Sequence, residues 1–206
     1  MIEVRRATTR FASVQPGITS WHCFSSGAHY DPANTGFGSV IALDEHAVAA
    51  GAGFGRHAHR GVEILSWVLA GTLSHEDGAG GLERIGPGTV LYQSAGSGIE
   101  HIEANASGTE PLRFVQLVLL GPVAAPQHSL SEPSLEVGDG KFEVLVPTRP
   151  VEVAAAAHAI VFVARGSVLL NGQRLSAGDS ARIRDTALRL QGNGVVLTWR
   201  SIPSVR

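Results

Sequence analysis

Short runs of strand-forming residues, separated by glycine or proline, recur along the whole chain and constrain its fold more than any other feature. Helix-type periodicity is scarce, whereas 25 glycines and 10 prolines among 206 residues provide frequent turns. The runs cover residues 39–43, 63–69, 89–92, 113–119, 142–146, 160–163, 167–170 and 195–199. Many short strands with regular turns are typical of sandwiches and barrels. The sequence therefore predicts an all-β fold.

A similar pattern of strands and glycine turns occurs in both halves of the chain. Residues 68–73 and 84–90 form the first copy, and residues 163–168 and 174–180 form the second. In each copy a strand turns at a glycine, and a later strand leads into another glycine-centred turn. Any two β-meanders share part of this pattern, so a chance likeness is the alternative. We favour a true duplication.

The duplication predicts two domains. We expect an N-terminal barrel over residues 1–125 and a C-terminal barrel over residues 126–206. The stretch 121–133 contains several prolines and serines, and we expect it to be a linker between the barrels. At 206 residues the chain is long enough for two small domains.

Charge and composition exclude several functional classes. Lys and Arg total 16 against 18 Asp and Glu, so no basic excess favours nucleic acid or anionic membranes. The single cysteine, Cys23, excludes an intrachain disulfide and a cysteine-rich zinc site. The near-apolar run 153–164 is too short to span a bilayer, and residues 1–6 lack the apolar region of a signal peptide. We expect a cytoplasmic protein that binds neither nucleic acid nor membrane.

Two pairs of residues with metal-ligand chemistry have strand spacing. His57 and His59 are two residues apart, and so are His101 and Glu103. Alternate side chains of a strand point to one face, so each pair would project together. Three imidazoles and one carboxylate suit a borderline divalent metal and not calcium or magnesium. The alternative is that these are ordinary surface or buried histidines.

The other histidines lack a comparable pattern. We expect His75 to occupy an exposed hairpin position rather than a place beside a metal. Structural or exposed roles are expected for His22, His29, His46, His128 and His158. Buried packing roles are expected for Cys23, Trp67, Phe114 and Trp199.

The residues around the two pairs resemble known family motifs. Gly51 precedes His57 by six residues and Glu63 follows His59 by four, a spacing similar to the first motif of the cupin superfamily. The runs 53–65, 68–77 and 95–105 resemble the signature of the pirin family within that superfamily. Further matches lie at 21–25, 30–32 and 36–38. The resemblance covers roughly residues 18–120 and is sharpest to short bacterial pirin-like proteins with quercetinase activity.

This resemblance implies a bicupin, with two jelly-roll-like β-barrels in one chain. Its N-terminal barrel would hold one divalent transition metal through His57, His59, His101 and Glu103. Fe(II) is the favoured metal, with Mn, Ni, Co, Cu and Zn as alternatives. In many other cupins the carboxylate ligand stands at the position of Glu63, so two carboxylates compete for the role. We favour Glu103, which could be a ligand, a catalytic base or both.

The resemblance implies a quercetin 2,3-dioxygenase, which cleaves flavonol-like substrates with O2. The alternative is a non-enzymatic, regulatory pirin that acts through a protein partner. Two positions depart from the family pattern, because Ala58 stands where proline is usual and Ile102 stands where serine is usual. Neither departure removes a ligand.

The second half of the chain lacks a matching ligand set. An alignment on the repeated glycines places four residues roughly opposite the four candidate ligands: Glu152, Ala154, Gln191 and Asn193. One carboxylate without an imidazole does not hold a transition metal. We therefore expect a metal-free second barrel.

Overall fold

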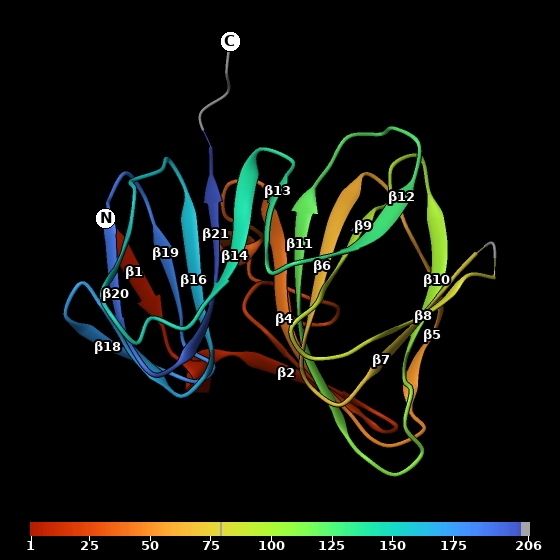
Figure 1. Cartoon of the computed structure of the whole chain (residues 1–206). Coiled ribbons are helices and arrows are strands. Elements are labelled where there is room, and N and C mark those ends of the chain that lie inside the picture. The colour runs from red at the N-terminus through yellow and green to blue at the C-terminus, as the bar shows by residue number, and fades with distance from the viewer. Residues whose placement is uncertain (79, 203–206) are drawn as a thin grey trace. The chain divides into compact units, whose positions relative to one another are not determined.

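The computed structural model describes residues 1–78 and 80–202, and strands dominate it (Figure 1). Within that part of the chain, helix is confined to two short 3-10 turns, η1 (Ala7–Thr9) and η2 (Pro32–Asn34). No helix among these residues has the length and apolarity needed to cross a membrane. The expected all-β fold is confirmed.

The chain divides into two compact units, and each is described here by itself. The first unit comprises residues 11–132, and the second comprises residues 1–10 together with 133–206.

The first unit contains two antiparallel sheets. Its strands are β2 (Phe11–Gln15), β3 (Ile18–His22), β4 (Val40–Val48), β5 (Gly53–His59), β6 (Val62–Ala70), β7 (Leu73–Asp77), β8 (Leu82–Ile85), β9 (Val90–Ser94), β10 (Ile99–Asn105), β11 (Leu112–Leu120) and β12 (Gln127–Ser131). Seven strands form a sheet in the order β12-β9-β6-β11-β4-β3-β2. The other four form a sheet in the order β5-β10-β7-β8.

The core of the first unit lies between these sheets. Val68, Leu91 and Phe114 come from the seven-stranded sheet and form one buried cluster with Leu73 and Ile85 from the four-stranded sheet. Side chains alternate between the faces of a strand, so one face of each sheet supplies the cluster. The result is a two-sheet sandwich of the jelly-roll type.

The second unit repeats this arrangement with shorter strands. Its strands are β1 (Ile2–Arg5), β13 (Ser134–Val137), β14 (Gly140–Leu145), β15 (Val151–Val153), β16 (Ala159–Arg165), β17 (Ser167–Leu170), β18 (Gln173–Ser176), β19 (Ser180–Ile183), β20 (Leu188–Gly192) and β21 (Val195–Ser201). They form sheets in the orders β1-β19-β16-β21-β14-β13 and β15-β20-β17-β18. Val161, Leu170 and Leu190 belong to the buried cluster that both sheets supply.

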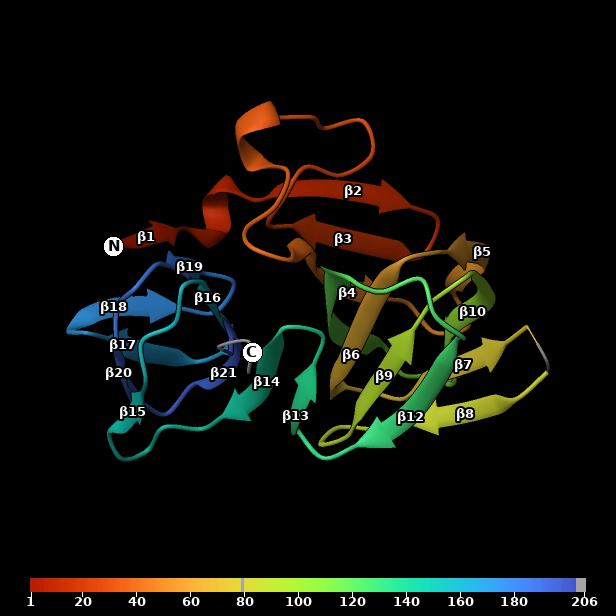
Figure 2. The same ribbon diagram turned by 90° about the horizontal axis from the view of Figure 1, so that it is seen from above.

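The two units have one strand order in common. In the smaller sheets, β5-β10-β7-β8 of the first unit corresponds to β15-β20-β17-β18 of the second (Figure 2). In the larger sheets, β9-β6-β11-β4-β3 corresponds to β19-β16-β21-β14-β13. Gly71 and Gly166 make the same bend, with positive φ angles of 80° and 71° that favour glycine. The topology therefore supports the duplication that the sequence pattern favoured.

The limits of the units differ from the boundary expected near residue 125. β1 pairs with β19, with Ile2 opposite Ile183, and the Arg6 guanidinium lies 2.8 Å from the Asp179 carboxylate. These contacts place the first ten residues in the second unit. Sequence patterns missed this because a pairing partner about 180 residues away leaves no local signal.

The linker expected over residues 121–133 is also partly wrong. β12, within this stretch, pairs with β9 and forms an edge of the seven-stranded sheet. Four of its five residues are exposed, so its sequence lacks the apolar alternation that marks a strand with one buried face.

Candidate metal centre

Three of the four predicted ligands meet on two paired strands. β5 and β10 are antiparallel neighbours, with His57 directly opposite His101 and His59 opposite Ile99. One nitrogen from each of His57, His59 and His101 lies within 4.8 Å of the other two. The spacing of two residues on β5 places His57 and His59 on one face, as strand geometry requires.

A bulge in β5 separates this histidine group from the rest of the ladder. The pairing shifts between His101 and Glu103, so that Glu103 stands opposite Phe54 rather than Gly55. Farther along, Gly53 allows a close approach, because a Cβ atom there would lie 2.5 Å from the Cβ of Ala104. Bulges commonly re-aim side chains beside functional sites, and this one lies next to His57.

A hydrogen bond orients His57 to act as a ligand. The Nδ1 of His57 donates to the carbonyl oxygen of Gly55 at 2.7 Å, which leaves its Nε2 with a lone pair. That Nε2 lies 2.8 Å from the Nε2 of His101, so the two nitrogens converge on the same region. Orientation of a ligand by its other ring nitrogen is usual in metal sites. The donor set therefore fits a borderline divalent metal.

Burial keeps two of the three imidazoles neutral. Desolvation and the neighbouring His57 lower the pKa of His59 to about 4. Desolvation together with His57, His59 and His75 lowers the pKa of His101 to about 3. Neutral imidazole is the form that binds a metal.

Glu103, the fourth predicted ligand, lies on β10 two residues beyond His101 and is buried. It is outside the group of three imidazoles. Its carboxylate accepts hydrogen bonds from the Gln116 amide at 3.1 and 3.3 Å and from the Ser66 hydroxyl at 3.3 Å. Burial raises the pKa of Glu103, and the bonds from Gln116 and Ser66 and the nearby His57 oppose that rise.

Gln116 and Ser66 were not identified from the sequence. They stand opposite each other in the pairing of β11 with β6, and the Gln116 amide also donates to the Ser66 hydroxyl at 3.0 Å. They contact Glu103 only because the seven-stranded sheet packs against the four-stranded sheet that contains β10.

The competing carboxylate, Glu63, is held elsewhere. Tyr92 donates to it at 2.6 Å and Ser94 donates to it at 3.0 Å. Because side chains alternate along β6, Glu63 points to the opposite face from Ser66, which contacts Glu103. The structure therefore does not bring Glu63 to the histidine group.

The expectation that His75 is exposed is wrong. Its side chain is completely buried, and its ring meets that of His101 edge to face with centroids 5.3 Å apart. Its Nε2 lies 2.7 Å from the Gln93 amide nitrogen. The polar sequence of β7 suggested a surface hairpin, but one face of this strand lies inside the sandwich. The expected burial of Cys23, Trp67, Phe114 and Trp199 is confirmed.

The second unit has apolar residues where the first has its histidines. Leu73 pairs with Asn105 and Val168 pairs with Gly192, each two residues after the shared glycine bend. Counting back from this common register places Leu188 and Leu190 at the positions of His101 and Glu103. Val153, which stands opposite Leu188, takes the position of His57.

The residues that sequence alignment placed opposite the candidate ligands are therefore not the ones that occupy those positions in the structure. Glu152 pairs with Arg189, and its carboxylate oxygen lies 3.6 Å from the Arg189 Nε. An error of one residue on a strand exchanges the two faces of the sheet. Val153, Leu188 and Leu190 are buried and offer no donor atom in their side chains.

A pocket of about 430 Å³ opens beside His59. Ala58, His59 and Arg60 form one wall, and residues 97–100 form the other. His59 is the candidate ligand that lines this pocket, whereas His101 and Glu103 are buried.

Comparisons with known proteins agree with this fold. Residues 2–119 match the family model described as Pirin. A quercetin 2,3-dioxygenase of Escherichia coli K12 is 30% identical in an alignment that covers 90% of each chain. A Mycobacterium tuberculosis protein provisionally named a quercetin 2,3-dioxygenase is 34% identical, covering 96% of this chain and 94% of its own. The E. coli bacterial pirin YhhW, crystallised with nickel(II), superposes with a TM-score of 0.89 at 29% identity, covering 98% of this chain and all of its own.

Proposed function

Because this chain belongs to the pirin family, we propose that it is a metal-dependent dioxygenase that cleaves quercetin-like flavonols with O2. The gathering of His57, His59 and His101 is the single observation that carries this proposal. Relatives named quercetin 2,3-dioxygenase match the chain over nearly its whole length and support the choice of substrate class.

The metal would be held by the three imidazoles, with Glu103 as the fourth ligand. We propose Fe(II), and nickel(II) in the E. coli pirin supports a divalent ion for this type of site. When bound, the ion would supply positive charge that favours an ionised enol and a redox-active centre for dioxygen chemistry.

Glu103 is the proposed catalytic base. It is the buried carboxylate nearest to His101 along β10, and a base must lie within reach of the proton that it accepts. The amide of Gln116 and the hydroxyl of Ser66 orient it, so it would receive the flavonol hydroxyl proton in a defined position.

We propose that the flavonol approaches the centre through the pocket beside His59. Its volume of about 430 Å³ lies in the range of small-molecule sites, and Ala58 and Ile99 give it apolar surface. Arg60 at the rim places a positive charge beside an anionic substrate.

Oxygen uptake tests the proposal. Metal-free protein would be loaded separately with Fe, Mn, Ni, Co or Cu and incubated with quercetin under an oxygen electrode, with carbon monoxide measured as coproduct. We expect uptake with at least the Fe(II) form and none with the His57→Ala/His101→Ala variant. Bound metal without uptake for any ion would contradict the enzyme and leave the regulatory alternative.

A further inference from the structure

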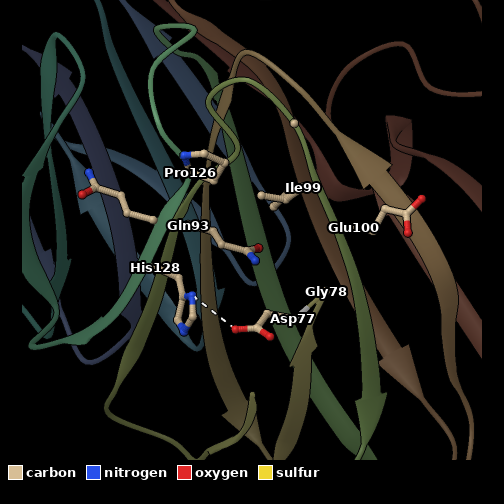
Figure 3. A pocket seen from close by; sticks show the side chains of 9 residues that line it. Asp77, Gly78, Gln93, Ile99, Glu100, Pro126 and His128 are labelled. Atoms are coloured by element: carbon tan, nitrogen blue, oxygen red, sulfur yellow. Dashed lines mark ion pairs between the residues drawn. The ribbon is translucent and has the colours of Figure 1, made fainter. Parts of the chain in front are cut away.

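A second pocket opens in the first unit, between the β12-β9 edge of the seven-stranded sheet and the four-stranded sheet (Figure 3). Its volume is about 360 Å³, which lies in the range of small-molecule sites. Gln93 and residues 126–128 line it from the larger sheet, and Asp77 and residues 98–100 line it from the smaller one. We call it the β9–β12 pocket.

The β9–β12 pocket is next to the pocket beside His59. Residues 98–100, around the start of β10, line both of them. Ile99 stands opposite His59 in the pairing of β10 with β5, and its side chain points toward Gln93 (Figure 3). Two pockets that share a wall suit the two ring systems of one ligand.

The orientation of the Gln93 amide follows from its neighbours. The Oε2 of Glu83 lies 3.8 Å from the Nδ1 of His75, and this negative charge favours the ring proton on Nδ1. The Nε2 of His75 then accepts a hydrogen bond from the amide nitrogen of Gln93, which lies 2.7 Å away. The amide oxygen of Gln93 therefore remains available as an acceptor.

This amide oxygen is buried at the wall of the β9–β12 pocket. Gln93 is 3% exposed, and its Oε1 has no hydrogen-bond partner among the described residues. Figure 3 shows its amide directed between Ile99 and Asp77. Buried polar atoms are nearly always hydrogen-bonded, so an unsatisfied one indicates a water or a ligand group beside it. A ligand that satisfies Oε1 must supply a donor.

The rest of the β9–β12 pocket combines a carboxylate with apolar surface. Asp77 accepts a hydrogen bond from the backbone of Gly81 at 2.8 Å and lies 4.0 Å from the Nδ1 of His128 at the partly exposed rim. Ile99 and Pro126 supply the apolar surface. Acceptors beside apolar groups suit an aromatic ring that carries hydroxyls, because the hydroxyls donate while the ring packs against carbon atoms.

We infer that the β9–β12 pocket binds the hydroxyl-bearing side ring of the flavonol, with Gln93 and Asp77 determining specificity for its hydroxyl groups. The inference rests on the proposed function, which brings the flavonol to the centre through the pocket beside His59. Arg60 gives that pocket a positive charge for an ionised enol, whereas Gln93 and Asp77 offer acceptors to neutral hydroxyls. The substrate class is thereby narrowed to flavonols with a catechol side ring.

Binding without turnover tests this subsite. The full-length protein would be loaded with Zn(II), which has no redox chemistry, and desalted, and the dissociation constants of two flavonols would be measured by calorimetry. Quercetin carries two adjacent hydroxyls on its side ring, and galangin is the same flavonol without them. We expect the native protein to bind quercetin about tenfold more tightly than galangin, which is the effect of one or two buried hydrogen bonds.

Two substitutions should reduce this preference. Gln93→Leu removes the buried acceptor and should bind quercetin about as weakly as galangin. Asp77→Asn removes the charge of the second acceptor and should lower the preference by about threefold. Glu76→Gln is the matched control, because this carboxylate lies on the other face of β7 beside Arg56, and it should keep the native preference. Zn(II) content would be counted for every variant, so that loss of metal is not mistaken for loss of the subsite.

Each outcome bears on the subsite separately from the reaction. Equal affinities of the native protein for the two flavonols would overturn the inference, and so would an unchanged preference in folded Gln93→Leu and Asp77→Asn. Asp77→Asn decides the matter if Gln93→Leu fails to fold or loses its metal. A preference for quercetin that both variants reduce, without oxygen uptake by any metal form, would support the subsite and reject the proposed reaction.

Discussion

The two units share a strand order but differ in what they enclose. The first unit has histidines and a glutamate on the inner side of β5, β7 and β10, whereas the second has Val153, Leu170, Leu188 and Leu190 at the corresponding places. The second unit thus gains apolar burial, and the first keeps donor atoms inside its sandwich at the cost of desolvation. One architecture can therefore serve packing in one copy and chemistry in the other.

The largest effect is expected from removing the histidines that distinguish the first unit. His57→Ala/His101→Ala should lose the metal of this centre and reduce flavonol turnover by more than the 10–100-fold that is typical for residues outside the coordination shell. Elemental analysis and oxygen uptake measure the two effects. His29→Ala is the control and should match the native protein. If the double variant still turned over quercetin, the histidines of the first unit would not be what distinguishes its function from that of the second unit.

Glu103→Gln should separate ligand from base at the position that Leu190 occupies in the second unit. Three imidazoles should still hold the metal with weaker affinity, while turnover falls by about 10²–10⁴-fold because the proton acceptor is lost. Metal affinity and kcat would be measured on the same preparation. Complete loss of metal would instead show that Glu103 acts chiefly as a ligand.

Glu63→Gln is the comparison for that experiment. Glu63 is held by Tyr92 and Ser94, so its replacement should lower the melting temperature and leave the metal in place. Loss of metal in Glu63→Gln would show that Glu63, and not Glu103, is the carboxylate ligand.

Leu190→Ala tests the packing role of the second unit. Leu190 is fully buried, and truncation of a buried leucine costs about 2–5 kcal/mol through lost contacts and a residual cavity. Denaturant unfolding measures this loss, and metal content should be unchanged. Leu169→Ala, on the exposed side of β17, should alter stability by less than about 0.5 kcal/mol. A lower metal content in Leu190→Ala than in the native protein would contradict a purely structural role of the second unit.

Acid should destabilise the first unit through His46. Burial lowers the pKa of His46 from 6.5 to about 4, with smaller opposing contributions from Asp44 and Glu45. The unfolded chain then binds the proton first, so this contribution to stability is intact above pH 6.5 and is lost as the pH falls toward 4. The loss is on the order of 3 kcal/mol.

Metal-free protein would be unfolded by denaturant between pH 7 and pH 4, beside His46→Gln. The difference between native and variant proteins should shrink as the pH falls. An unchanged difference across this range would contradict a depressed pKa for His46.

Much of the candidate centre could be predicted because its signals are local. Two histidines separated by one residue on a strand face the same way whatever the partner strand, and the family resemblance indicated how the two pairs combine. By contrast, the contact of Gln116 with Glu103 depends on the packing of one sheet against the other. The burial of His75 likewise depends on the enclosure of β7 in the sandwich. Sequence alignment placed Gln191 at the position of His101, whereas the strand register places Leu188 there. A small error in register therefore changes which face of the strand a residue occupies.

The sequence by itself determined the all-β class, the repeated glycine bends and the two pairs of candidate ligands, because these depend on turn residues and on alternation within single strands. Only the tertiary structure decided that residues 1–10 join the second unit, that residues 127–131 form an edge strand, and that Glu63 points away from the histidines. Each of these outcomes depends on pairing or packing between segments distant in the chain. Such contacts are selected by the burial and hydrogen bonding of the whole sheet, and no short stretch of sequence specifies them.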